Sequence, residues 1–215
     1  MKARGLTHLL VSTLLMFLCF SDGWAQQKMV QIERVLNLFS GLPSTWPVQH
    51  GDRWCWAASA EIIMSSHGQT SWKQCIQADD ANPGKSSPRT CCDYPYASPC
   101  NRTGWPHFEY YGFDYSRTAE PLTWEEITKQ IDQDLPVAIA VQYTDPADPS
   151  ISHGGHMGVI AGYLVLNGQK KILIIDPDGF HGVMWTLYDE VVGNSSGTVR
   201  HWRTYYDIRP FSPSP

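Results

Sequence analysis

The sequence lacks any cluster of basic residues. Its 215 residues include 16 lysines and arginines against 21 aspartates and glutamates, so the formal net charge is −5. Proteins that bind nucleic acids carry basic patches that neutralise phosphates. The chain has no such patch, and we therefore expect no nucleic-acid partner.

The sequence also lacks an apolar run long enough to cross a membrane as a helix, which needs about 20 residues. Its longest run, Leu9 to Phe20, follows Lys2 and Arg4 and precedes the small-x-small triplet Gly-Trp-Ala at 23–25. This pattern is typical of a secretory signal peptide. We therefore predict a signal peptide over residues 1–25, a secreted or periplasmic mature protein, and no membrane association after signal removal.

The mature chain has an odd number of cysteines. Of six cysteines, one lies in the signal peptide, and the five that remain are Cys55, Cys75, Cys91, Cys92 and Cys100. Thiols pair in an oxidising compartment, so one of five stays free or pairs between chains. Four of them lie in a proline-rich, loop-like stretch that needs cross-links to hold a shape. Adjacent cysteines would form a strained ring, so we predict that Cys75 pairs with one of them and Cys100 with the other.

Two other uses of cysteine are disfavoured. The sequence has no C-x-x-C pair and no histidine at a ligand-like spacing from the cysteine cluster, which argues against a zinc site. Acylation at Cys19 would make the chain a lipoprotein, but Phe17 and Leu18 stand where such a site prefers small residues. We expect no metal and no cofactor.

Cys55 begins an alanine-rich run, CWAASAEIIMSS, that contains no glycine or proline. The run predicts a helix over residues 55–66, ended by Gly68, with Asp52 able to cap its start. Cys55 then lies in the first turn, where unpaired backbone N–H groups and the helix dipole favour a negatively charged thiolate. The alternative is a buried cysteine packed between its two tryptophan neighbours.

Gln49 lies six residues before Cys55, just upstream of the predicted helix. Its side-chain amide can fold back beside the backbone N–H of Cys55. Two such donors would form an oxyanion hole, which stabilises the tetrahedral intermediate of acyl transfer. Gln49 therefore favours a catalytic interpretation of Cys55.

His156 is the best candidate for the base that a cysteine nucleophile needs. It follows two glycines and opens the apolar run of "SHGGHMGVIAGYLVL", which predicts a largely buried strand. Glycines at such a place allow another backbone or a substrate to approach closely. His153 is the competitor, but it lies in a loop rich in proline and serine.

A second apolar strand follows a turn at residues 167–168 and ends in Asp176. Directly opposed residues of a hairpin share a face, so a regular two-residue loop would put His156 and Asp176 on opposite faces. We therefore predict a three-residue loop over 166–168 or a single bulge. Asp178 is the rival partner for the imidazole, although Pro177 is expected to end the pairing near Asp176. A plain turn or a weak calcium loop is the alternative for Asp-Pro-Asp-Gly.

Three segments together resemble the papain-like cysteine peptidases. "QHGDRWCWAASAEIIM" most resembles the bacterial branch that includes plant-pathogen avirulence proteases and double-glycine-leader peptidases. "GGHMGVIAGY" followed by "ILIIDP" resembles the His and Asp segments of the same family. The resemblance implies Cys55 as nucleophile, His156 as general base and acid, Asp176 as the residue that orients the imidazole, and Gln49 in the oxyanion hole. Papains have asparagine at the place of Asp176.

The predicted fold is α+β, a papain-like two-lobed arrangement with the N-terminal nucleophile helix packed against a C-terminal antiparallel β-sheet. A capping box over Thr123–Glu126 opens a later helix, and five segments follow as strands: "LPVAIAVQY", the strands of His156 and Asp176, "GVMWTLY" and "TVRHWRTYYDI". We divide the chain into a signal peptide (1–25), an N-terminal segment (26–43), a catalytic domain (44–210) and a disordered tail (211–215).

The sequence thus predicts a secreted, monomeric cysteine peptidase that acts on protein or peptide substrates. A thiol-dependent deamidase or acyltransferase is an alternative, because these reactions share the thioester intermediate. A non-catalytic binding module is another, since eight of the nine tryptophans lie in the mature chain and aromatic faces can stack on ligands.

Overall fold

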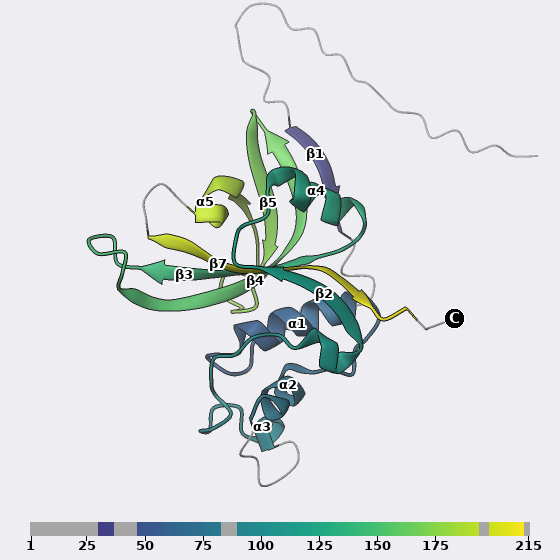
Figure 1. Cartoon of the computed structure of the whole chain (residues 1–215), viewed down its shortest axis with the longest axis vertical. Coiled ribbons are helices and arrows are strands. Elements are labelled where there is room, and N and C mark those ends of the chain that lie inside the picture. The colour runs from purple at the N-terminus through teal and green to yellow at the C-terminus, as the bar shows by residue number, and fades with distance from the viewer. Residues whose placement is uncertain (1–29, 37–46, 83–89, 194–197, 213–215) are drawn as a thin grey trace, which may run out of the picture.

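The described part of the protein consists of one antiparallel sheet with helices packed against it (Figure 1). A computed structural model describes residues 30–36, 47–82, 90–193 and 198–212. The predicted signal peptide lies outside the described residues. No helix within the described ranges is long and apolar enough to cross a membrane.

The sheet has the strand order β2-β7-β3-β4-β5-β6. β1 lies off this order and pairs with the C-terminal end of β4, residues 162–166. Neighbouring strands are antiparallel throughout. The strands are β1 Val30–Val35, β2 Phe113–Thr118, β3 Val137–Thr144, β4 Ser152–Leu166, β5 Gln169–Ile175, β6 Val183–Leu187 and β7 Val199–Pro210. The sequence patterns predicted β3 to β7, whereas β1 and β2 are new findings.

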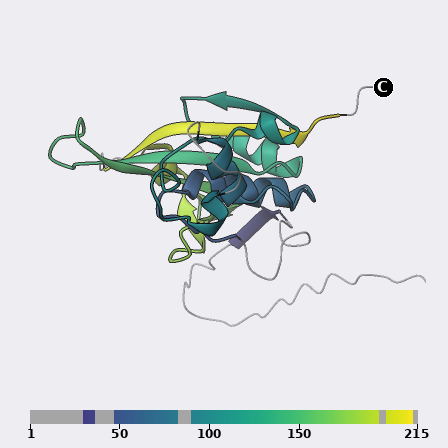
Figure 2. The ribbon, with the colours of Figure 1, turned by 90° about the horizontal axis from the view of Figure 1, so that it is seen from below.

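The helices α1, α2 and α3 lie together on one side of the sheet, as the two perpendicular views show (Figures 1 and 2). The helical elements are α1 Cys55–Ser66, α2 Gln74–Asp80, α3 Thr90–Asp93, the 3-10 turn η2 Phe108–Tyr111, α4 Trp124–Asp132 and α5 Tyr188–Gly193. The predicted bounds of α1 and the capping box of α4 are confirmed. The Cys-rich stretch, residues 74–100, was predicted to be rich in loops, but it contains α2 and α3.

α1 is buried along nearly its whole length, from Trp56 to Ser65. A helix that is apolar or small on all sides belongs in a core. The Ser59 hydroxyl donates a hydrogen bond to the Met157 carbonyl of β4 at 3.2 Å, which ties the helix to the sheet. The predicted α+β arrangement, with this helix packed against an antiparallel sheet, is confirmed.

The predicted cap of α1 is wrong. The helix begins directly after Trp54, and no side chain caps it. The Asp52 carboxylate instead accepts a hydrogen bond from the Asn101 amide at 3.3 Å. The other end agrees with the prediction, because Gly68 adopts a φ of +80° and its N–H donates to the Ser65 carbonyl at 2.9 Å.

The β4–β5 hairpin has a two-residue loop and one bulge. Asn167 and Gly168 have φ angles of 53° and 76°, as a type I′ turn requires. The predicted three-residue loop is therefore wrong. The predicted alternative is confirmed, because the register shifts between Ile160 and Gly162, which leaves Ala161 as the extra residue. The bulge places His156 and Asp176 on one face.

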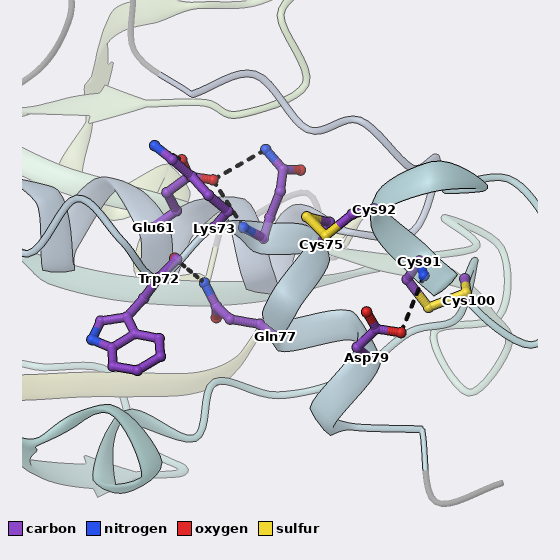
Figure 3. The surroundings of a disulfide bond; sticks show 10 residues. Glu61, Trp72, Lys73, Cys75, Gln77, Asp79, Cys91, Cys92 and Cys100 are labelled. Atoms are coloured by element: carbon purple, nitrogen blue, oxygen red, sulfur yellow. Dashed lines mark hydrogen bonds and ion pairs between the residues drawn. A yellow bond between two sulfur atoms is a disulfide. The ribbon is translucent and has the colours of Figure 1, made fainter. Parts of the chain in front are cut away.

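Two disulfides hold the Cys-rich segment, Cys75–Cys92 and Cys91–Cys100 (Figure 3). The predicted pairing is confirmed, and Cys55 is free. The disulfide between Cys91 and Cys100 packs against the fully buried Trp54, whose indole N–H donates to the Cys100 carbonyl at 2.9 Å. The cross-linked segment therefore fixes the residue that precedes α1.

Candidate active site

Cys55 is the first residue of α1 and is partly exposed. Its neighbours Trp54 and Trp56 are buried, with exposed fractions of 0% and 2%. The two indoles anchor the backbone on either side and leave the thiol at the surface. This arrangement differs from the buried, packed cysteine that the sequence left as an alternative.

His156 and Asp176 are in direct contact. The imidazole Nε2 lies 2.6 Å from the Asp176 carboxylate, with His156 on β4 and Asp176 directly after β5. The Asp178 backbone N–H donates to the same carboxylate oxygen at 2.9 Å. Because Nε2 is engaged with Asp176, Nδ1 is the ring nitrogen that remains for a second partner.

Cys55 and His156 line one cavity of about 260 Å³. The rings of Trp105 and Trp202 form its apolar wall, edge to face at a centroid distance of 4.8 Å. A Cβ atom on Gly155 would lie 2.6 Å from the Trp202 ring. The glycine before His156 is therefore required for a close approach, as predicted, but the group that approaches most closely is the Trp202 side chain rather than a backbone or a substrate.

The electrostatic surroundings favour the charged form of His156. Burial alone would lower the pKa of the imidazole from its ordinary value of 6.5. The hydrogen bonds and charges of Asp176 and Cys55 outweigh burial and raise the pKa of His156 to about 10. At neutral pH the site therefore holds an imidazolium between the thiol and a carboxylate.

Gln49 lies between the start of α1 and the loop that carries Asp176. Its side-chain Nε2 donates to the Asp52 carbonyl at 3.2 Å, and its backbone N–H donates to the Pro177 carbonyl at 2.7 Å. An amide has two N–H donors, so this hydrogen bond to Asp52 uses one of them. The role of Gln49 in an oxyanion hole remains a prediction.

A buried polar network that sequence reasoning missed holds the Gln49 segment. Gln74 accepts from the His50 backbone N–H at 2.8 Å and donates to the Val48 carbonyl at 2.9 Å. Glu61, 5% exposed within α1, in turn accepts from the Gln74 backbone N–H at 3.0 Å and from Lys73 at 3.1 Å (Figure 3). A glutamate within an alanine-rich, apolar helix was the available signal.

The competing residues lie in other contacts. His153 is exposed and 3.4 Å from Asp145. Asp178, the rival partner for the imidazole, lies 2.6 Å from His181 and accepts the backbone N–H groups of Phe180 and His181. The Asp-Pro-Asp-Gly segment is thus a side-chain-stabilised turn beside the site.

The chain matches the Peptidase_C39 like family over residues 42–206. It belongs to this family. The family supports a cysteine peptidase, and within it the avirulence-protease likeness remains a prediction. Comparison with curated protein sequences finds no match.

A solved structure with a TM-score above 0.5 bears on the fold. A protein described as a C39-like peptidase from Bacillus anthracis has a TM-score of 0.53 and 16% identity, covering 83% of this chain and 100% of that one. This likeness shows a shared fold. The digestive procathepsin L 3 of Tenebrio molitor matches with a TM-score of 0.46 and 15% identity, covering 81% of this chain and 70% of that one.

Proposed function

We propose that this chain is an exported cysteine peptidase that hydrolyses peptide bonds through Cys55, His156 and Asp176. One observation carries the proposal: a free thiol at a helix N-terminus and an imidazole hydrogen-bonded to a carboxylate line the same cavity. A nucleophile, a base and a group that orients the base are the parts that covalent acyl transfer needs.

In the first step, the Cys55 thiolate attacks the substrate carbonyl carbon, and an S–C bond forms while the carbonyl oxygen becomes an oxyanion. The Cys55 backbone N–H lies in the first turn of α1, where it has no partner within the helix. That N–H and the second N–H of the Gln49 amide are the donors for the oxyanion in our proposal.

In the second step, the His156 imidazolium donates its proton to the leaving amine, and the C–N bond breaks. Water then attacks the thioester carbonyl carbon and gives a proton to His156. The C–S bond breaks, so the carboxylic acid leaves and the Cys55 thiolate and the His156 imidazolium are restored. Asp176 fixes the ring orientation and stabilises the imidazolium through the 2.6 Å contact.

The disulfides support the exported location. Cys75–Cys92 and Cys91–Cys100 are the kind of cross-link that persists in oxidising compartments. A cysteine peptidase in such a compartment needs a thiol that has no pairing partner, and Cys55 meets that condition.

Digestion of a mixture of synthetic peptides, followed by mass spectrometry, tests the proposal. Wild-type protein should generate new amino termini, and Cys55→Ala should generate none. Conversion of glutamine to glutamate, or transfer of acyl groups to an added amine, without peptide cleavage would assign the same site to a deamidase or an acyltransferase. A lack of all three reactions would contradict the enzyme proposal.

A further inference from the structure

A second cavity adjoins His156 on the side of Asp176. It encloses about 260 Å³ between β3, β4, β5, β6 and α5. Its wall is mainly apolar, and the side chains that form it include Ile139, Val141, Tyr143, Ile174, Met184 and Val191. This volume exceeds the roughly 150 Å³ of a cavity that holds benzene, so a leucine or phenylalanine side chain fits.

The position of this cavity relative to the thiol is informative. The cavity with the two tryptophans is lined by both Cys55 and His156. Among the described residues, those that line the second cavity include His156 and Asp176 but not Cys55. His156 therefore separates the two cavities, with the thiol on one side.

The chemistry of acyl transfer places one half of the substrate on each side of His156. The acyl half becomes bonded to the Cys55 sulfur, so it occupies the cavity that contains the thiol. The other half leaves as an amine that takes its proton from His156, so its nitrogen must lie at the imidazole. The side chain nearest that nitrogen then faces the second cavity.

Tyr143 marks the rim of the second cavity. It lies on β3, two residues after Val141, which is directly opposite His156. The residue is 43% exposed. Burial of the hydroxyl, followed by the charges of Asp176, Asp178 and Cys55, raises the pKa of Tyr143. Tyr143 therefore presents a neutral phenol at the second cavity, which Asp176 also lines.

We propose that the second cavity binds the side chain of the residue directly after the cleaved bond, and that it selects a large apolar side chain there. This inference rests on the proposed peptidase function. The apolar wall favours leucine, isoleucine, methionine or phenylalanine. The carboxylates of Asp176 and Glu190, which also line the cavity, disfavour acidic residues.

The experiment is a cleavage-site analysis of a complex peptide mixture. Wild-type protein should cut before large apolar residues at least about 10-fold more efficiently than before glycine or aspartate, a ratio in the range for apolar pockets. Met184→Trp fills the cavity and should shift the preference to glycine, alanine and serine. Trp185→Met is the matched control, since adjacent residues of β6 point to opposite faces.

Thermal melting checks that both variants are folded. If Met184→Trp is not folded, Met184→Ala replaces it and should improve cleavage before phenylalanine and tryptophan. A folded Met184 variant with the wild-type preference would overturn the inference, as would wild-type cleavage without any preference at this position. In both cases the peptidase activity itself would stand, whereas a wild type that cleaves no peptide overturns the proposed function as well.

Discussion

The Asp176 carboxylate lies 2.6 Å from the Nε2 of His156, although a two-residue turn joins their strands. A regular hairpin with that turn would place the two side chains on opposite faces of the sheet. The single bulge at Ala161 shifts the register by one residue and brings them together. A catalytic arrangement on this hairpin therefore depends on one extra backbone residue about a third of the way along β4 from the turn.

We expect His156→Ala to abolish peptide cleavage while the fold remains intact, because the variant has no group to transfer the proton. General acid–base catalysis alone contributes about 10²–10⁴-fold. His153→Ala is the matched control and should retain wild-type activity, since His153 is exposed and contacts Asp145. Full activity of His156→Ala would move the base to another histidine. Steady-state cleavage rates, with circular dichroism of both variants, make the comparison.

Gln49→Ala should lower kcat by about 10²-fold or more, as the loss of one oxyanion donor does. Substrate binding should change far less, because the interaction forms with the oxyanion and not with the ground-state carbonyl. His50→Ala is the neighbouring control, since its contact with Gln74 is made by the backbone N–H. A Gln49→Ala variant with unchanged kcat would remove Gln49 from the proposed mechanism.

The free energy of unfolding should fall as the pH rises from about 6.5 towards 10. The pKa of His156 is raised to about 10 in the folded protein from an ordinary value of 6.5, so the folded state binds an extra proton in this window. The stabilisation is complete below the unfolded pKa and is lost above the folded one. In Asp176→Asn, which lacks the carboxylate charge, this slope should be shallower. Urea unfolding at several pH values measures it, and identical slopes in the two proteins would contradict the assignment.

Loss of the Cys91–Cys100 disulfide should destabilise the fold and slow the alkylation of the candidate nucleophile, Cys55. The double variant Cys91→Ala, Cys100→Ala should lower the free energy of unfolding by about 2–5 kcal/mol. It also removes packing around Trp54, which precedes α1, so alkylation of Cys55 should slow. The Cys75–Cys92 pair is the control, because Cys91 and Cys100 are both buried in the cluster with Trp54, whereas Cys75 is only partly buried against it and Cys92 is not part of it. Equal alkylation rates in both double variants would contradict this coupling.

Local sequence patterns were enough to predict the nucleophile helix, the free thiol and the need for a register change between His156 and Asp176. The alanine-rich run after Cys55 predicted the bounds of α1, and cysteine parity predicted one free thiol. The strained ring of adjacent cysteines predicted that Cys75 and Cys100 each bond to one of them, but not to which one.

His156 and Asp176 both have even numbers, so a regular two-residue hairpin would put them on opposite faces. Their contact therefore required a shift in register, and the structure contains one between Ile160 and Gly162. Its position could not be predicted, because a bulge inserts one residue without a distinctive side chain.

Features that depend on tertiary contacts were missed. Asp52 matches the preference for a helix cap, yet its carboxylate pairs with Asn101, 49 residues away. Trp202 comes from the last strand, and nothing in its local sequence places its ring against Gly155. Tyr143 lies in an ordinary strand pattern, and only the folded sheet brings it beside His156.

The most direct test of the account is alkylation of the non-reduced protein with iodoacetamide near pH 6, followed by peptide mass mapping. The account predicts fast labelling confined to Cys55 in the wild type, because Cys55 is free, is partly exposed and lines one cavity with the His156 imidazole. His156→Ala should label much more slowly at the same pH. A Cys55 that is unlabelled, is found in a disulfide, or reacts equally fast without His156 would contradict the central claim.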